Sequence, residues 1–305
     1  MGGGRAPGAK EERLIPPGSR RPFLIAGPCV LEDESMALRV ADAMAVHARG
    51  LGLFYIFKAS YLKDNRTSGK SYTGPGLERG LRVLAKVRSA VGVPILTDVH
   101  SCEEVDAVAA IADVLQIPAF LCRQSRLLAA CAATGKALNI KKGQFLAPAD
   151  MAQAVAKVSE VAPGAEILLT ERGSCFGYRD LVVDMRGIAL MRSMGCRVVF
   201  DATHALQKPG KGGDRRFAAS LARAALGAGA EGMFVEVHPD PSKALSDATT
   251  QLPLEAMPRF LKDWARLGDL IEQLERSDTA ENGPDWPGLE RPVVAGQPPG
   301  ALREV

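Results

Sequence analysis

Eight short apolar runs of the sequence each end in, or lead directly into, polar side chains that could do chemistry. In chain order these are Cys29; Lys58 and Ser60; Asp98 and His100; Gln116 and Arg123; Lys141 and Lys142; Glu171 and Arg172; Asp201 and His204; and Glu236 and Asp240. Any one of them has an ordinary explanation, such as an ion pair between Arg172 and Glu171. Buried charges are costly unless paired or bound to a ligand, so all eight together indicate a shared site.

Cations form the first chemical group within this set. They suit a substrate that carries several phosphate or carboxylate groups, because guanidinium and ammonium groups bind such anions. Together with two that follow the second run, they are Lys58, Lys63, Arg66, Arg123, Lys141 and Arg172.

Possible metal ligands form the second group: Cys29, His204, Glu236 and Asp247. Thiolate, imidazole and carboxylates make a mixed donor set that fits Zn²⁺, Fe²⁺, Mn²⁺ or a similar divalent ion. From the residues alone, other roles stay open. Cys29 can be a small buried hydrophobe, His204 a general base, and Glu236 the partner of an arginine.

The apolar runs themselves are typical of parallel strands buried on both faces, because they are nearly continuous in hydrophobicity. We predict strands at 23–29, 53–60, 94–99, 114–120, 137–143, 166–172, 197–204 and 232–238. Segments of helical period lie at 35–49, 77–90, 103–111, 125–134, 149–161, 184–194, 217–228 and 253–274. This alternation predicts an α/β protein of one (β/α)8 TIM-barrel domain, whose strand ends carry the active site. An open doubly wound sheet is the alternative, although no GxGxxG follows the first strand.

Composition narrows the class of protein further. The chain has 305 residues, of which 47% are hydrophobic, and 38 Lys and Arg against 35 Asp and Glu give a formal charge of +3. This small charge does not favour nucleic-acid or membrane binding. No CxxC pair, no leader and no apolar run of membrane-spanning length are present, which predicts a cytoplasmic protein.

Both ends differ in composition from the barrel. Residues 1–20 are rich in Gly, Pro and charge, and residues 277–305 are rich in Pro, Gly and Glu without a sustained apolar period. We therefore predict a flexible N-terminal extension at 1–20, a catalytic barrel at 21–276 and a loose C-terminal extension at 277–305.

The motifs at the strand ends resemble those of the 3-deoxy-manno-octulosonate 8-phosphate (KDO8P) synthase family over about residues 23–274. They are IAGPC (25–29), FKAS (57–60), KDNRTS (63–68), GPGL (74–77), LTDVH (96–100), QIPAFLCRQ (116–124), NIKKGQF (139–145), TERG (170–173), FGY (176–178), DATH (201–204), EVHPD (236–240) and LSDATTQLPL (245–254). The resemblance implies condensation of phosphoenolpyruvate with D-arabinose 5-phosphate, which supplies the Kdo sugar of lipopolysaccharide. It also implies a homotetramer.

The resemblance further implies a role for each site residue. Phosphoenolpyruvate would be held by Lys58, Lys63, Lys141, Gln116 and Arg172, and the aldose phosphate by Asn65, Arg66 and Thr67. Arg123 would reach the site of a neighbouring subunit. The catalytic set implied is Lys58, Lys63, Asn65, Asp98, Lys141 and His204, with Ser60 and Gln144 among the residues that bind substrate.

The resemblance also bears on the metal. Metal-dependent members have Cys at the position of Cys29, whereas metal-independent members have Asn, and residues 246–248 and 251–254 also resemble the metal-dependent class. Cys29, His204, Glu236 and Asp247 are thus implied as ligands of a divalent metal. Departures from the family pattern are Asp64, Thr67 and a segment at 207–216 that looks shorter than usual.

Three other functions remain as alternatives. A DAHP synthase would use erythrose 4-phosphate, but those relatives usually lack a residue like Asn65 in the KDNRTS segment. A Schiff-base aldolase would use Lys58 as its nucleophile. A catalytically silent barrel is disfavoured, because the ligand and cation sets are both intact.

Overall fold

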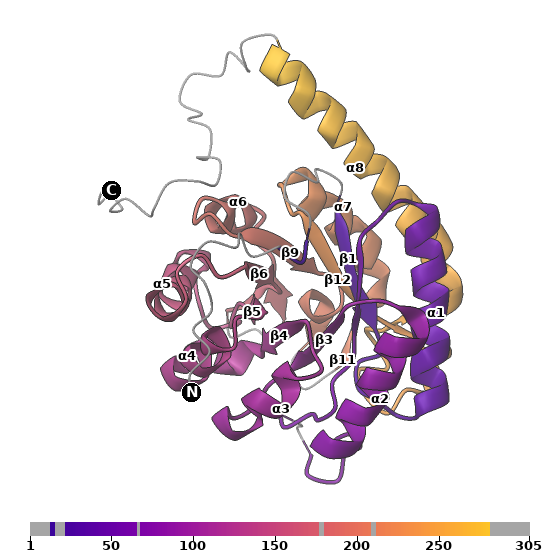
Figure 1. Ribbon diagram of the computed structural model, residues 1–305. Helices are drawn as coiled ribbons and strands as arrows, with labels where there is room; N and C mark the ends of the chain where they lie inside the picture. The colour runs from indigo at the N-terminus through magenta and orange to yellow at the C-terminus, as the bar shows by residue number, and fades with distance from the viewer. Residues whose placement is uncertain (1–12, 16–21, 66–67, 177–179, 209–211, 281–305) are drawn as a thin grey trace.

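A closed barrel of eight parallel strands forms the centre of the computed structural model, which describes residues 13–15, 22–65, 68–176, 180–208 and 212–280 (Figure 1). The strands are β1 (Phe23–Gly27), β2 (Tyr55–Lys58), β3 (Ile95–Asp98), β4 (Val114–Ile117), β5 (Ala137–Lys141), β6 (Ile167–Glu171), β9 (Arg197–Asp201) and β12 (Gly232–His238). They pair in this order, and β1 pairs with β12 to close the ring. The predicted (β/α)8 barrel is confirmed.

Helices surround the strands on the outside of the barrel (Figure 1). They are α1 (Glu34–Gly50), α2 (Leu77–Val91), α3 (Val105–Ala109), α4 (Ser125–Ala133), α5 (Met151–Val161), α6 (Arg186–Arg192), α7 (Ala218–Gly227) and α8 (Met257–Ala280). The Asp33 side chain caps α1 by accepting a hydrogen bond from the Met36 backbone N–H at 2.8 Å. Helix α8 runs past residue 276, the predicted end of the barrel, and lies against α1 and α7.

Two short pairs of antiparallel strands lie at the end of the barrel where the parallel strands end. Strand β7 (Ser174–Cys175) pairs with β8 (Leu181–Val182), and β10 (Gln207–Lys208) pairs with β11 (Gly212–Gly213). Strand β13 (Leu252–Pro253) adds to β12 in parallel. The sequence did not indicate these strands, because two residues are too few to show a period.

The two faces of the barrel wall are chemically different, because successive side chains of a strand point to opposite faces. One set of strand residues packs outward against the helices, for example Leu24, Phe57 and Leu169. The other set points inward and fills the half of the barrel interior that lies nearest the N-terminal ends of the strands. It consists of Phe23, Ile25, Ile56, Leu96, Val114, Ala137, Leu168, Val199 and Phe234.

Residues 14 and 15 fill the bottom of this interior. Ile15 is only 2% exposed and packs with the inner apolar set, while Glu166 accepts hydrogen bonds from the backbone N–H groups of Leu14 (2.8 Å) and Ile15 (3.3 Å). These two residues were predicted to belong to a loose extension, but they are packed as part of the barrel. Most of that extension, and residues 281–305, lie outside the described residues.

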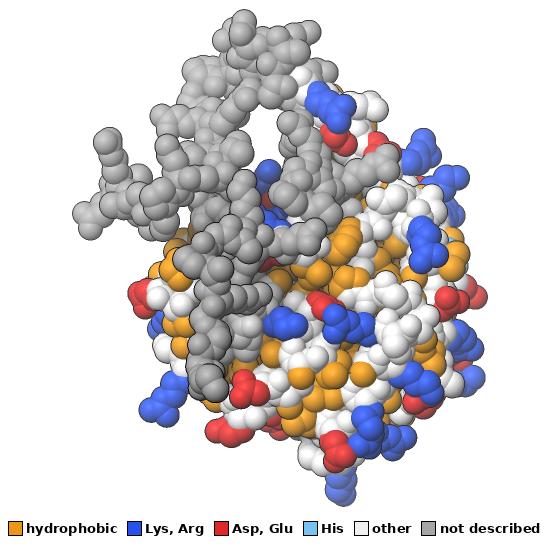
Figure 2. Space-filling view, viewed as in Figure 1, with side chains coloured by type: hydrophobic (Ala, Val, Ile, Leu, Met, Phe, Trp, Pro, Cys, Tyr) orange, Lys and Arg blue, Asp and Glu red, His pale blue; other side chains and the backbone are white. Residues whose placement is uncertain are grey.

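The surface carries both signs of charge. On the face shown in Figure 2, Lys and Arg side chains alternate with Asp and Glu rather than forming a continuous basic area. Among the described residues, no helix has the length and apolar character needed to cross a membrane.

Candidate active site

Polar side chains replace apolar ones in the half of the barrel interior that lies nearest the C-terminal ends of the strands. They stand two or four positions after residues of the inner apolar set and therefore point to the same side of each strand. All of them are buried: Lys58, Asp98, Gln116, Asn139, Lys141, Thr170, Arg172, Asp201 and Glu236. A pocket of about 270 Å³ opens above them, and its walls include Lys58, Lys63, Asn65, Lys141 and Arg172. Four of the six predicted cations, Lys58, Lys63, Lys141 and Arg172, therefore line one pocket.

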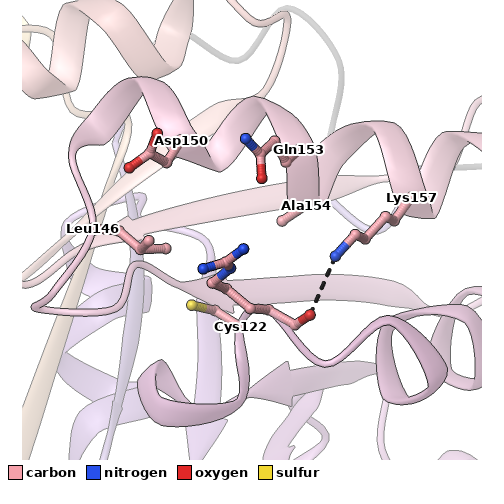
Figure 3. Close-up of a pocket in the computed structure, with 7 residues that line it drawn as sticks. Cys122, Leu146, Asp150, Gln153, Ala154 and Lys157 are labelled. Carbon is pink, nitrogen blue, oxygen red and sulfur yellow. Dashed lines mark hydrogen bonds between the residues drawn. The ribbon is translucent and has the colours of Figure 1, made fainter.

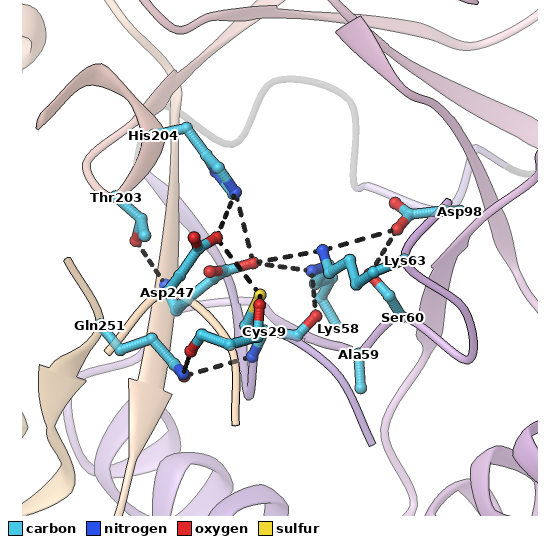
Figure 4. A network of polar contacts seen from close by, with 12 residues as sticks. Cys29, Lys58, Ala59, Ser60, Lys63, Asp98, Thr203, His204, Asp247 and Gln251 are labelled. Carbon is cyan, nitrogen blue, oxygen red and sulfur yellow. Dashed lines mark hydrogen bonds and ion pairs between the residues drawn. The ribbon is translucent and has the colours of Figure 1, made fainter. Parts of the chain in front are cut away.

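Glu236 interacts with two lysines, Lys58 and Lys63, which lie next to each other in the site (Figure 4). Lys58 Nζ donates to Glu236 Oε1 at 2.9 Å and to the Cys29 carbonyl at 3.0 Å, and Lys63 Nζ lies 3.9 Å from the same Glu236 oxygen. Burial raises the pKa of Glu236, but the positive charges of Lys58 and His204 outweigh burial and leave this pKa below its ordinary value. Glu236 is therefore ionised at neutral pH.

Three of the four predicted metal ligands form a compact cluster around this carboxylate. The Cys29 sulfur and one oxygen each of Glu236 and Asp247 all lie within 4.8 Å of one another. The fourth, His204, directs Nε2 at the cluster, 3.6 Å from both Glu236 Oε1 and Asp247 Oδ2 (Figure 4). Glu236 Oε2 is buried and has no hydrogen-bond partner among the described residues. A thiol, an imidazole and two carboxylates around an unpartnered oxygen fit a divalent cation.

The ligand side chains are oriented by their neighbours. Asp201 Oδ2 binds His204 Nδ1 at 2.8 Å, which leaves Nε2 free to face the cluster. Burial lowers the pKa of His204, but the charges of Asp201 and Glu236 outweigh burial and raise this pKa above its ordinary value. Burial and the nearby charge of Glu236 raise the pKa of the Cys29 thiol well above its ordinary value. A bound cation would favour the thiolate.

Asp247 has an unusual backbone conformation. Its φ of 48° is the only positive φ of a non-glycine residue in the described part of the chain. Such a conformation costs about 1–3 kcal/mol and persists only where surrounding contacts impose it. One such contact comes from Gln251, whose backbone N–H donates to the Asp247 carbonyl at 3.0 Å, and whose side chain binds the Cys29 backbone N–H at 3.2 Å.

A chain of hydrogen bonds links five residues on β3 to β6 and just after β2, on the side of the barrel opposite the metal-ligand cluster. Ser60 Oγ and Gln116 Nε2 donate to the two oxygens of Asp98. Asn139 Nδ2 donates to Gln116 Oε1 at 2.8 Å, and Thr170 Oγ1 donates to Asn139 Oδ1 at 2.6 Å. Burial raises the pKa of Asp98, but Lys58 and Lys63 outweigh burial and lower it, so Asp98 is a fixed anion rather than a proton acceptor.

Lys141 is another buried cation of the pocket. Its ammonium group binds Asp201 and lies 3.2 Å from the centre of the Phe234 ring. Burial lowers the pKa of Lys141 to about 8, although Asp201 acts in the opposite direction. Part of the Lys141 population is therefore neutral in mildly alkaline solution.

Lys142 and Glu171 point to the outer face of the wall and bind each other, with 3.4 Å between Nζ and Oε1. Lys142 Nζ also donates to the Gly173 carbonyl at 3.1 Å and to Ser174 Oγ at 2.9 Å. Glu171 therefore pairs with Lys142 and not with Arg172, its neighbour in sequence. Arg172 points inward, and its Nη2 donates to Gln207 Oε1 at 2.7 Å.

The remaining predicted residues lie in different places. Asn65 lines the main pocket and is exposed, whereas Arg66 and Thr67 lie outside the described residues. Gln144 Oε1 is buried and has no hydrogen-bond partner in the described part of the chain.

Arg123 lines a separate pocket of about 110 Å³. Asp150, Gln153 and Lys157, at the start of α5 and within it, line the same pocket (Figure 3). Lys157 Nζ donates to the Arg123 carbonyl at 3.2 Å. The structure of one chain thus does not bring Arg123 to the main pocket, and its action on a neighbouring subunit stays a prediction.

A barrel whose mouth joins buried cations to a cluster of thiol, imidazole and carboxylates defines a class: TIM-barrel enzymes that act on small anionic substrates. The chain belongs to the DAHP synthetase I family, whose sequence pattern matches residues 9–273.

Relatives named 2-dehydro-3-deoxyphosphooctonate aldolase, a synonym of KDO8P synthase, are about 50% identical to this chain. The Syntrophotalea carbinolica protein is 53% identical over 254 residues, which cover 82% of this chain and 91% of the relative. The Geobacter strain M21 protein is 51% identical, with 84% and 96% covered, and the Aromatoleum aromaticum protein is 52% identical, with 82% and 92% covered. The resemblance drawn from the strand-end motifs is confirmed.

Proposed function

We propose that this protein condenses phosphoenolpyruvate with D-arabinose 5-phosphate and water, giving 3-deoxy-D-manno-octulosonate 8-phosphate and phosphate. The observation that carries the proposal is the pocket that joins Lys58, Lys63, Lys141 and Arg172 to Asn65. Four cations in one pocket match two phosphorylated substrates. The relatives that match this chain over most of their length are named for this activity.

For this reaction, the residues of the chain must hold two anionic substrates next to each other and must offset their negative charge. The enol carbon of phosphoenolpyruvate attacks the aldehyde carbon, water adds to the neighbouring carbon, and the resulting hemiketal phosphate loses phosphate by C–O cleavage. Lys58, Lys141 and Arg172 hold the anionic groups in register and offset their charge, which is catalysis by proximity and electrostatic stabilisation. The fixed anions Asp98 and Glu236 keep the lysine ammonium groups in place.

Comparing two aldoses tests the substrate. Phosphate release with phosphoenolpyruvate should be fast with arabinose 5-phosphate and slow with erythrose 4-phosphate. A clear preference for erythrose 4-phosphate would favour the DAHP synthase alternative. Borohydride trapping of a substrate adduct on Lys58 would favour the aldolase alternative.

We also propose that Cys29, His204, Glu236 and Asp247 hold a divalent metal. When bound there, such an ion supplies Lewis acidity that can acidify a water or polarise the aldehyde. Chelation should abolish phosphate release, and readdition of single metals should restore it. Activity retained after chelation, or in Cys29→Asn without metal, would show that the metal is not required.

Assembly and location complete the proposal. We propose a cytoplasmic homotetramer, in which Arg123 acts on the site of a neighbouring subunit. Arg123→Ala should then weaken arabinose 5-phosphate binding without changing phosphoenolpyruvate binding. A monomeric mass by light scattering would contradict this assembly.

A further inference from the structure

Strands β10 and β11 lie directly on the loop that carries Asp247. The β11 residues are both glycines, and the packing requires them. A Cβ on Gly213 would overlap Thr250 Cγ2 and lie 2.7 Å from the Leu206 carbonyl oxygen, while one on Gly212 would lie 2.9 Å from Thr249 Oγ1. The described parts of segment 207–216 are therefore built to pack against residues 247–251.

Gln207 uses both ends of its amide at this contact. Its Oε1 accepts a hydrogen bond from Arg172 Nη2 at 2.7 Å, and its Nε2 donates to Asp247 Oδ1 at 3.3 Å. The amide orientation is unambiguous, because a guanidinium can only donate, so Gln207 Oε1 faces Arg172 and Nε2 faces Asp247. One side chain thus joins the anion pocket to the metal-ligand cluster.

Arg215 makes a second contact with the same loop. Its guanidinium binds the backbone carbonyls of Ala248 and, at 3.2 Å, Thr249, which directly follow Asp247 in the chain. These contacts hold the residues next to the strained φ of 48°. The adjacent Arg216 differs, because it is exposed and pairs with Asp214 within its own segment.

We propose that Gln207 is a positioning residue shared by two subsites, holding Arg172 for the carboxylate or phosphate of phosphoenolpyruvate and Asp247 for the divalent cation. Arg215 supports only the second of these. This inference rests on the proposed function for the identity of the two ligands. It assigns roles to Gln207 and Arg215 that neither the motifs nor the proposed metal-ligand set supplies.

Two binding constants test the inference: calorimetric binding of phosphoenolpyruvate to metal-free protein, and Co²⁺ binding without phosphoenolpyruvate, followed by thiolate-to-cobalt absorption. Gln207→Leu should weaken both by about tenfold, because each loses a hydrogen bond to a charged group. Arg215→Ala should weaken Co²⁺ binding at least threefold and leave phosphoenolpyruvate binding unchanged. Arg216→Ala, the matched control, should change neither.

The changes in the two binding constants, compared between the variants, decide whether the inference holds. The inference is overturned if Gln207→Leu leaves either constant within twofold of the parent, or if Arg216→Ala matches Arg215→Ala. Should Gln207→Leu fail to fold, Gln207→Met keeps the length of the side chain and gives the same readout. Intact binding without turnover of arabinose 5-phosphate would overturn only the proposed function, whereas a parent that does not bind phosphoenolpyruvate would overturn both.

Discussion

Lys141 shows how a single buried cation makes binding sensitive to pH. The Lys141 pKa of about 8 arises from burial, and the ordinary value is 10.5. Only the ammonium form attracts an anion. We expect the affinity of metal-free protein for phosphoenolpyruvate to fall as pH rises through about 8, by up to about tenfold per pH unit if the charged form alone binds.

Unfolding does not explain such a loss. Between pH 8 and 10.5 the unfolded chain binds more protons at Lys141 than the folded chain, so this residue makes stability rise with pH in that window. Calorimetry from pH 7 to 9.5, with circular dichroism as the control for folding, checks this expectation. In Lys141→Arg the charge persists, and the decline near pH 8 should disappear. An unaltered decline in that variant would assign it to another group.

Asn139 and Thr170 extend the hydrogen-bond chain that fixes Asp98 and Gln116. Asn139→Asp replaces a donor by an acceptor facing Gln116 Oε1, and we expect it to lower the free energy of unfolding by about 1–3 kcal/mol. Thr170→Val removes the last donor, whereas Thr170→Ser keeps it and is the matched control. Urea denaturation measures all three variants, and equal losses in Thr170→Val and Thr170→Ser would contradict a role for the hydroxyl.

Some individual residues of the site could be predicted from the sequence. Lys58, Asp98, Lys141 and Glu236 were predicted as site residues, because charges at the ends of buried strands are costly unless they are paired or bind a ligand. Asn139 and Thr170 were missed, although counting in twos along strands already predicted places them on the inner face beside Lys141 and Arg172.

At the scale of elements, Lys142 and Glu171 join the ends of β5 and β6. Lys142→Met leaves the buried Glu171 carboxylate unpaired, and we expect a loss of about 3–5 kcal/mol in the free energy of unfolding. The double change Lys142→Met with Glu171→Leu should cost markedly less, because no unpaired charge remains. Urea denaturation of both variants checks this, and equal losses would show that the pair itself, rather than the unpaired charge, sets the cost.

Long elements were predictable and short ones were not. All eight barrel strands were found. The predicted bounds of β12 match the structure, whereas the other seven predictions extend one to three residues beyond the strand at one or both ends. The roles of Gln207 and Arg215 could not be predicted from the sequence, because their contacts depend on loop geometry and on the positive φ of Asp247. Neither leaves a periodic signal in sequence.

At the scale of the whole molecule, Ile15 closes the end of the barrel opposite the site. Ile15→Ala should lower the free energy of unfolding by about 2–5 kcal/mol, the usual cost of emptying a buried aliphatic position. Co²⁺ affinity should stay unchanged, because the site lies at the other end. Leu14→Ala, at a half-buried neighbour, should cost less in the same urea titration. A cost for Ile15→Ala below 1 kcal/mol would mean that the contact contributes little.

This closure also has a consequence for the order in which the chain is made. Ile15 leaves the ribosome long before Phe234, which belongs to the same apolar cluster, and β1 must likewise wait for β12, its closing partner. Ile15 and β1 are therefore among the last parts of the barrel to be packed. Until synthesis passes residue 238, the nascent barrel keeps an open edge and an open floor, which are apolar surfaces that favour aggregation.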